Sequence, residues 1–176
     1  IRIFTMGVNS WRNESQWPLE RSVTTPLFFH SSGRAASSID DGSLTTDPPG
    51  GEPVDRFAYD PAEPVPTRGG VLSVHMMTAH AEEPLEAGAV DQRDLEARGD
   101  VLVYTTPVLA DPVEVTGPVS VVLFAESTAV DTDFTARLVD VHPDGTACLV
   151  TEGILRARYR HGLEQTELLA SGVPEK

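Results

Sequence analysis

Short apolar segments alternate with turn residues along the whole chain, and the longer amphipathic repeats that are typical of helices are scarce. The apolar segments are rich in valine, phenylalanine, tyrosine and threonine, and fourteen glycines and fourteen prolines are spread between them. This pattern is typical of an all-β sandwich or barrel. It predicts strands near residues 1–6, 23–30, 55–59, 70–76, 100–105, 113–126, 132–142 and 146–160.

The clearest turn signal lies in "RLVDVHPDGTACLV", where the tetrapeptide HPDG at 142–145 separates two strand-like runs. Proline favours the start of a turn and glycine accepts a positive φ, so we expect an antiparallel hairpin here. Within 113–126, the positions from Val119 to Ala125 are apolar on both alternating faces. That pattern predicts a strand covered on both sides, near the centre of a sheet.

Two connections between the expected strands are long and polar, at residues 31–53 and 78–99. Long connections in a compact β domain are usually functional or mobile. A length of 176 residues is enough for one domain to bury a core of its own. We therefore expect a single β-sandwich domain over residues 1–176.

The charge of the chain limits its partners. A formal net charge of −14 argues against a nucleic-acid surface, because phosphate binding needs clustered cations. No apolar run approaches the roughly 20 residues of a membrane span, so we expect neither nucleic acid nor membrane as a partner. Cys148 is the only cysteine and does not indicate a compartment, so the localisation stays open. One lysine against twelve arginines favours a GC-rich bacterial source.

The chain lacks the motifs of a catalytic or metal centre. A nucleophile elbow needs Gly-x-Ser-x-Gly, and the nearest serine cluster, "SSGRAASS", reads as a surface loop. His75 and His80 bracket "HMMTAH", but on an extended segment their rings point in different directions, and no glutamate follows as in the zinc signature. We expect no catalytic residue, no metal and no cofactor within this chain.

Charged residues of both signs gather in the C-terminal third. The acidic members are Asp131, Asp133, Asp140 and Asp144. The basic members alternate along "ILRARYR" and so share one strand face: Arg156, Arg158 and Arg160. The turn at 142–145 would lay this strand against the one that carries Asp140. We therefore favour structural ion pairs between the arginines and Asp140 over a calcium site or an anionic ligand site.

Six segments together resemble one known family, in its order and spacing: "IFTMGVNSWRNESQWP", "FAYDPAEPVPTRGG", "DQRDLEARGDVLVYTT", "VEVTGPVSVVLFAES", "DTDFTARLVDVHPDG" and "GILRARYR". They resemble the C-terminal jelly-roll domain of the X-Pro dipeptidyl-peptidase and cocaine-esterase family of serine hydrolases. The resemblance implies an all-β jelly roll related to galactose-binding domains. It also implies an α/β-hydrolase domain with a Ser-Asp-His triad in the part that would precede Ile1, so no catalytic residue carries over to this sequence.

The stretch "NSWRNESQWP" holds both tryptophans of the chain, Trp11 and Trp17, among polar residues. The resemblance places it just after the first strand of the sandwich. Large apolar anchors within a polar rim are typical of a docking surface, so we expect Trp11, Arg12 and Trp17 to face the hydrolase domain. In the alternative interpretation, both rings plug the end of the sandwich core.

The resemblance also implies a wall of the substrate cleft. In the family, residues just beyond Gly69 and Gly70 approach the active site, and the matching positions here are Ser73, Val74 and His75. Ser73 and Val74 are small where a bulky apolar wall would be expected, which leaves the size of the acyl pocket open. The alternative for His75 is a buried structural histidine.

These features predict the non-catalytic C-terminal domain of a bacterial serine hydrolase, of dipeptidyl-peptidase or acyl-esterase type. Such a domain would stabilise the hydrolase domain and complete its substrate cleft. An independent carbohydrate-binding module is the alternative, because the fold is shared. The first residue is not methionine, and the family's sandwich continues beyond the position of Lys176. We therefore expect a piece of a longer protein that lacks its last strands, and that either associates with a second copy through the open sheet edge or is less stable than a chain extended to the natural C-terminus.

Overall fold

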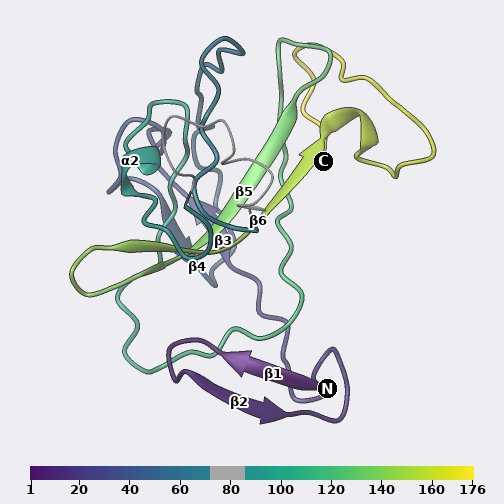
Figure 1. Cartoon of the computed structure of the whole chain (residues 1–176). Helices are drawn as coiled ribbons and strands as arrows, with labels where there is room; N and C mark the ends of the chain where they lie inside the picture. The colour runs from purple at the N-terminus through teal and green to yellow at the C-terminus, as the bar shows by residue number, and fades with distance from the viewer. Residues whose placement is uncertain (72–85) are drawn as a thin grey trace. The chain divides into compact units, whose positions relative to one another are not determined.

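A computed structural model describes residues 1–71 and 86–176 of the chain. Its strands are β1 (Arg2–Thr5), β2 (Ser10–Asn13), β3 (Phe28–His30), β4 (Ser43–Thr45), β5 (Asp133–Val141) and β6 (Ala147–Arg156) (Figure 1). Helix is confined, in these two ranges, to the single turn α2 (Arg93–Glu96) and the 3₁₀ helix η1 (Ala157–Tyr159). The expected all-β class is confirmed. None of the described helices has the length and apolar character needed to traverse a bilayer.

The chain divides into two compact units. Unit 1 comprises Ile1–Arg56 and Val103–Ser120, and unit 2 comprises Phe57–Leu102 and Val121–Lys176. The buried apolar side chains of unit 1 are those of Leu19 and Ala35. Among the described residues of unit 2, they belong to Leu95, Ala147, Leu149, Ala157 and Leu169.

Unit 1 contains two antiparallel pairs of strands, β1 with β2 and β3 with β4. The strand β4 also meets residues 103–105 in parallel, with the amide of Leu44 donating to the carbonyl of Thr105 at 3.0 Å. Gly42 makes this close approach feasible, because an added Cβ would lie 1.8 Å from the carbonyl oxygen of Val103. Only glycine fits there.

A carboxylate fixes the long loop that follows β3. Asp55 accepts hydrogen bonds from the amide of Ala35 at 2.8 Å, the hydroxyl of Ser31 at 2.6 Å and the hydroxyl of Tyr104 at 2.7 Å. Burial, and then the bond to Asp55, raise the pKa of Tyr104 above its ordinary value. The ring of Tyr104 lies 4.5 Å from that of Phe29 in β3, so the same cluster joins the loop to the strand.

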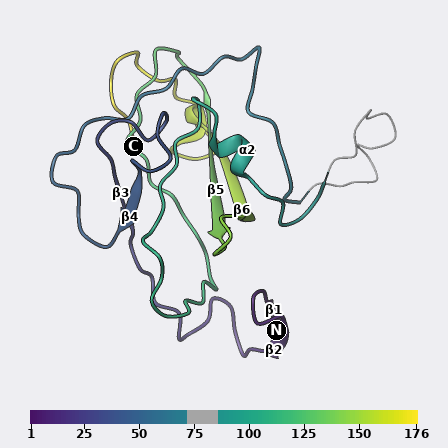
Figure 2. The same cartoon turned by 90° about the vertical axis from the view of Figure 1, so that its left-hand side faces the viewer.

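The long hairpin of β5 and β6 organises unit 2, and Figure 2 shows its two strands side by side from a second direction. The turn at 142–145 forms as its sequence predicts, with the amide of Gly145 donating to the carbonyl of His142 at 2.8 Å and a φ of +85° at Gly145. A register shift between Leu138 and Val139 places a bulge in the ladder. The expected hairpin is confirmed.

Several expected strands are shorter than the pattern suggested or are not formed. Strand β3 takes up only the end of 23–30, and no strand is assigned over 55–59. The segment 113–126 was expected at a sheet centre, and this expectation is wrong for the described structure, which gives it only one bridge, from Ala125 to Glu175. Gly117, with φ +155°, and Pro118, which has no amide donor, interrupt the segment. Its apolar side chains are consequently exposed, Phe124 most of all.

The arginines of unit 2 do pair with carboxylates near the end of β6. Arg156 donates to both oxygens of its cross-strand partner Asp133, at 2.9 and 2.7 Å. Arg158 donates through its side chain to Asp131 at 2.6 Å and through its backbone amide at 3.0 Å. These contacts favour structural ion pairing over calcium binding for Asp131 and Asp133.

The expected partner Asp140 is corrected by the register of the hairpin. Asp140 lies opposite Cys148, far from Arg156 along β6, and its one described ion pair is with His142 at 3.5 Å. The arginines also do not share a strand face, because β6 ends at Arg156 and η1 follows. Arg160 donates instead to Glu167 at 2.9 Å.

These pairs predict different responses to neutralising two aspartates. Burial tends to raise the pKa of Asp131, but the hydrogen bonds from Arg158 outweigh it, so the pKa lies below its ordinary value of 3.8. A lowered pKa stabilises the folded state above the ordinary value and ceases to do so as the pH falls. Asp131→Asn should therefore lower the urea midpoint at pH 7, by an amount that shrinks below pH 3.8.

The matched control is Asp140→Asn, because 68% of the Asp140 side chain is exposed against 12% for Asp131. This substitution should leave the urea midpoint unchanged both at pH 7 and below pH 3.8. Equal shifts for the two variants would contradict the observed pairing.

Candidate functional site

The hairpin of β1 and β2 in unit 1 separates its residues onto two faces. Residues 6–9 form the turn, with positive φ at Gly7 and Asn9. Phe4 pairs with Trp11 and Ile3 pairs with Arg12 across the ladder. Because side chains alternate along a strand, Phe4 and Trp11 share the exposed face, whereas Ile3 and Arg12 share the partly covered one.

The exposed face is aromatic. The rings of Phe4 and Trp11 lie 5.3 Å apart between centroids, tilted by 58°, and the guanidinium of Arg2 lies 5.0 Å from the centroid of the Trp11 ring. Trp11 is 58% exposed and Trp17, in the loop after β2, is 52% exposed. Rings this accessible do not plug a core in the described part of the chain.

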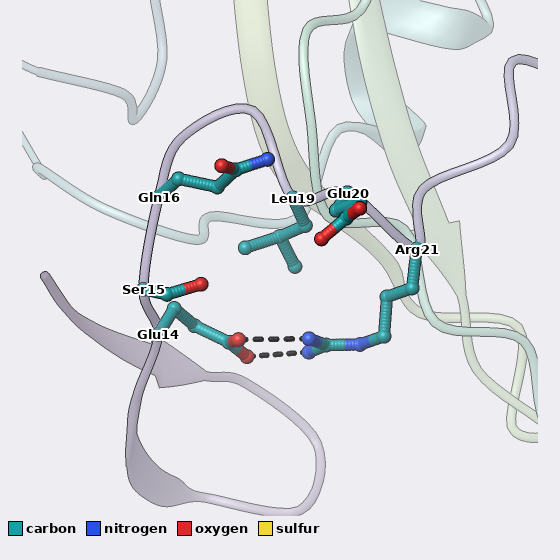
Figure 3. Close-up of a pocket in the computed structure, with 6 residues that line it drawn as sticks. All are labelled: Glu14, Ser15, Gln16, Leu19, Glu20 and Arg21. Carbon is teal, nitrogen blue, oxygen red and sulfur yellow. Dashed lines mark hydrogen bonds and ion pairs between the residues drawn. The ribbon is translucent and has the colours of Figure 1, made fainter.

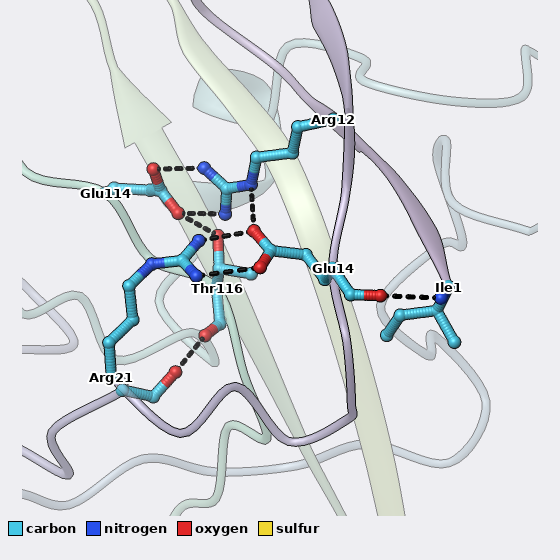
Figure 4. A network of polar contacts seen from close by, with 7 residues as sticks. Ile1, Arg12, Glu14, Arg21, Glu114 and Thr116 are labelled. Atoms are coloured by element: carbon cyan, nitrogen blue, oxygen red, sulfur yellow. Dashed lines mark hydrogen bonds and ion pairs between the residues drawn. The ribbon is translucent and has the colours of Figure 1, made fainter.

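The side chain of Arg12, on the other face of the hairpin, takes part in a network of charges (Figure 4). Its guanidinium donates to Glu114 in a two-point contact, one bond measuring 2.7 Å, and its Nε lies 2.8 Å from Glu14. Arg21 makes a similar two-point contact with the same Glu14, one bond measuring 2.7 Å. The network fastens the hairpin to residues 114–116 of the same unit. The described contacts of Arg12 therefore lie within unit 1, on the face of the hairpin opposite to that of Trp11.

The network lowers the pKa of both carboxyl groups. The hydrogen bond from Arg12, followed by one from Thr116, holds the pKa of Glu114 at about 2. The hydrogen bond from Arg21 lowers the pKa of Glu14. Both carboxyl groups therefore keep their charge to a lower pH than an ordinary glutamate does. Spacing in the sequence gives no sign of the contact between Arg12 and Glu114, because 102 positions separate them.

A hollow of about 270 Å³ lies beside the network (Figure 3). Leu19 is its buried floor, and the rest of the lining is polar. The lining residues are Glu14, Ser15, Gln16, Leu19, Glu20 and Arg21. The lining holds no histidine that could activate Ser15 as a nucleophile.

The expected cleft residues Ser73, Val74 and His75 lie outside the described residues. The glycine pair that precedes them is described. Gly69 and Gly70 both have positive φ, of +77° and +74°. Gly70 forms an antiparallel bridge with Gly88, through bonds of 2.8 and 2.9 Å.

Comparison with known proteins gives consistent matches. Residues 1–176 match the X-Pro dipeptidyl-peptidase C-terminal non-catalytic domain. Cocaine esterase from Rhodococcus sp. (strain MB1 Bresler) is 48% identical over 172 residues, which cover 98% of this chain and 29% of the esterase. Among solved structures, an aminopeptidase from a marine sediment Thaumarchaeota archaeon matches 99% of this chain and 28% of its own, with a TM-score of 0.72 and 26% identity.

A second solved structure, an α-amino acid ester hydrolase, has a TM-score of 0.74 at 24% identity, over 99% of this chain and 29% of that one. This likeness bears on the fold alone. The chain thus spans less than a third of the length of the proteins that it matches.

The charge network makes a prediction about acid titration. Removing the Arg12 guanidinium by Arg12→Gln should raise the pKa of Glu114 from about 2 toward its ordinary value of 4.5. Arg21→Gln is the matched control, because it should raise mainly the pKa of Glu14. The carboxyl carbon shifts of both glutamates, followed by NMR against pH, distinguish the two effects.

The sign of the pH effect follows from the lowered pKa. In the unsubstituted chain, the contribution of Glu114 to stability should be complete above pH 4.5 and should disappear as the pH falls through about 2. A Glu114 carboxyl that titrates near 4.5 in the unsubstituted chain would contradict the network.

Proposed function

Because this chain belongs to the family of X-Pro dipeptidyl-peptidase C-terminal non-catalytic domains, we propose that it is the accessory β domain of a serine hydrolase. It docks onto the catalytic domain of the same protein, stabilises that domain and completes its substrate cleft. The catalytic domain performs the acyl transfer with a Ser-Asp-His triad. The observation that carries the proposal is the family match over residues 1–176.

The small share of the esterase's length that this chain covers supports a separate catalytic domain. The chain accounts for 29% of the esterase that it resembles, and its own sequence contains no Gly-x-Ser-x-Gly. A nucleophile and its base therefore have to come from another part of the protein. The relatives include a cocaine esterase and an aminopeptidase, so the substrate class is a carboxylic ester or amide.

The aromatic face of the hairpin is the proposed contact with the catalytic domain. Aromatic anchors surrounded by polar residues are the commonest centres of binding energy in protein interfaces. Trp11 and Trp17 have this character, and the polar hollow beside Leu19 extends the same region of unit 1. The network around Arg12 holds the hairpin in place, so the anchors are presented on a fixed support.

The cleft wall is proposed at Ser73, Val74 and His75. Its support is the family resemblance of the segment that follows Gly69 and Gly70. Two small side chains there would leave room for a large acyl or acyl-amino group.

Carbohydrate binding has less support. A sugar ring stacks on a flat, open aromatic face, whereas Arg2 covers one face of Trp11 and Phe4 tilts against it. A glycan panel titrated against tryptophan fluorescence provides the test, and a saturable shift would favour the binding module.

A docking residue and a core residue respond differently to truncation. We expect Trp11→Ala and Trp17→Ala each to change the unfolding free energy of this chain alone by about 1 kcal/mol or less, since both rings are exposed. In the complete hydrolase, each substitution should weaken the attachment of the two domains by about 2 kcal/mol or more. Thermal unfolding of both proteins, with residual esterase activity after heating, measures the contrast.

Tyr59→Ala is the matched control. Tyr59 is an aromatic residue with the same 52% exposure as Trp17, but it belongs to unit 2. It should be neutral in both proteins. Large losses in the chain alone would assign the tryptophans to the core, and neutrality in the complete hydrolase would refute the docking surface.

A further inference from the structure

Both ring nitrogens of His30, in β3, lie beside hydrogen-bond acceptors of unit 1. Its Nδ1 lies 2.8 Å from Oε1 of Glu52, and its Nε2 lies 2.9 Å from the backbone carbonyl oxygen of Asp47. Nε2 also lies 3.0 Å from the hydroxyl of Thr45, in the neighbouring strand β4. The ring is partly covered, with 19% of the side chain exposed. One histidine therefore contacts both ends of the segment 47–52, which follows β4.

The two acceptors determine the charge of the ring. A neutral imidazole has one N–H and one acceptor nitrogen, whereas the imidazolium donates from both nitrogens. Neither a backbone carbonyl nor an ionised carboxylate can donate. In a neutral ring, one nitrogen would therefore turn its lone pair toward Glu52 or toward the carbonyl of Asp47. A bond from the Thr45 hydroxyl to Nε2 would leave that carbonyl facing the same lone pair. The geometry fits the imidazolium.

The charges around His30 favour the same state. The charged side chains that act on the ring are those of Glu52 and Asp47, whereas Ser43, its cross-strand partner in β4, is uncharged. The hydrogen bond to Glu52 outweighs the opposing effect of burial and raises the pKa of His30 above its ordinary value of 6.5. The same bond contributes most to the fall in the pKa of Glu52, from 4.5 to about 2. Both groups are therefore charged between pH 4.5 and 6.5.

The segment 47–52 has few other bonds to the rest of unit 1. Among the described residues, its one further hydrogen bond outward runs from the amide of Asp47 to the hydroxyl of Thr45, at 3.1 Å. All six residues of the segment are exposed. Its two prolines have no amide to donate, and its two glycines accept many backbone conformations. The contacts of His30 therefore account for most of what holds the segment closed.

The chain on both sides of the segment is fixed independently of His30. The strand β4 precedes it and pairs with β3 and with residues 103–105. After it, Pro53 packs on Gly33, where an added Cβ would lie 3.1 Å from the Cβ of the proline. Asp55 then accepts the three hydrogen bonds described above. Release at His30 therefore frees the segment and leaves the remainder of unit 1 in place.

We propose that His30 is a pH switch: its imidazolium holds the segment 47–52 closed against β3 and β4, and loss of the ring proton releases the segment. The switch is independent of the proposed function. A histidine with a raised pKa stabilises the folded state fully below 6.5, and this contribution disappears as the pH rises through the higher folded value. The segment should therefore be closed between pH 4.5 and 6.5 and open in alkaline solution.

The test follows the ring and the segment together by NMR. The ¹⁵N shifts of His30 should report an imidazolium at about pH 5.5, with a titration midpoint above 6.5. The order parameters of the Cα–H bonds of Gly50 and Gly51, from ¹³C relaxation, should fall across the same midpoint from about 0.85 to below about 0.6. Gly42, which is buried in the same unit, is the internal control and should stay rigid.

Two substitutions in the segment separate the contact with Glu52 from a general loss of negative charge. Glu52→Gln should move the pKa of His30 toward 6.5 and move the release of the segment to lower pH by the same amount. Asp47→Asn is the matched control, because it removes one charge from the same segment but keeps the backbone carbonyl that faces Nε2. Its effect on both midpoints should be smaller.

A third substitution removes the titrating group. His30→Gln should abolish the pH-dependent step at Gly50 and Gly51, whereas His142→Gln, in unit 2, should leave it unchanged. A step that persists in His30→Gln would overturn the switch. So would a His30 ring that is neutral at about pH 5.5, glycines that stay rigid through its midpoint, or equal shifts in Glu52→Gln and Asp47→Asn. The last three comparisons keep His30 in the chain, so they decide the matter even where His30→Gln does not fold.

Discussion

Backbone amides outside a sheet ladder still need acceptors when water is excluded, and this requirement governs a chain with so little regular structure. Side-chain carboxylates supply many of the acceptors. The amides that they bind, at 2.8 to 3.2 Å, include those of Ser32 and Arg34 on Asp41, Ala35 on Asp55, Arg93 and Ala147 on Asp91, Arg158 on Asp131, and Thr146 on Asp144. The acidic excess behind the net charge of −14 is therefore partly structural, and not only a means of solubility.

Single side chains also join segments that are far apart in the sequence. In the first hairpin, side chains alternate between the two faces of β2, so Trp11 lies on the exposed face and Arg12 lies on the opposite one. Arg12 binds Glu114 there and attaches the hairpin to the rest of unit 1. In unit 2, the side-chain amide of Gln92 donates to the carbonyls of Arg68 and Val90.

Local signals in the sequence were enough for some of this structure. The HPDG turn specified the long hairpin, and the polar surroundings of Trp11 and Trp17 pointed to exposure, because turn geometry and local composition are short-range properties. Contacts set by tertiary structure were not accessible. Asp140 and Arg158 have opposite charges and were expected to pair, but the hairpin register leaves Asp140 opposite Cys148, and Arg158 binds Asp131. Likewise, nothing in the sequence around Gln92 indicated that this glutamine would be buried. The apolar run from Val119 to Ala125 gave a wrong prediction of a central strand for a related reason. A hydrophobic pattern indicates that side chains can be buried, but it does not indicate which element would cover them.

Trp11 and Trp17 are proposed to form a contact with a catalytic domain. Because the chain has only two, labelling it with 5-fluorotryptophan gives one ¹⁹F resonance for each of Trp11 and Trp17. In the chain alone, both resonances should shift between H₂O and D₂O, as exposed rings do. Adding the unlabelled catalytic part of the complete protein should move both resonances and suppress that solvent shift. Resonances that are already insensitive to solvent in the chain alone, or that stay unchanged while the complex forms, would contradict the account.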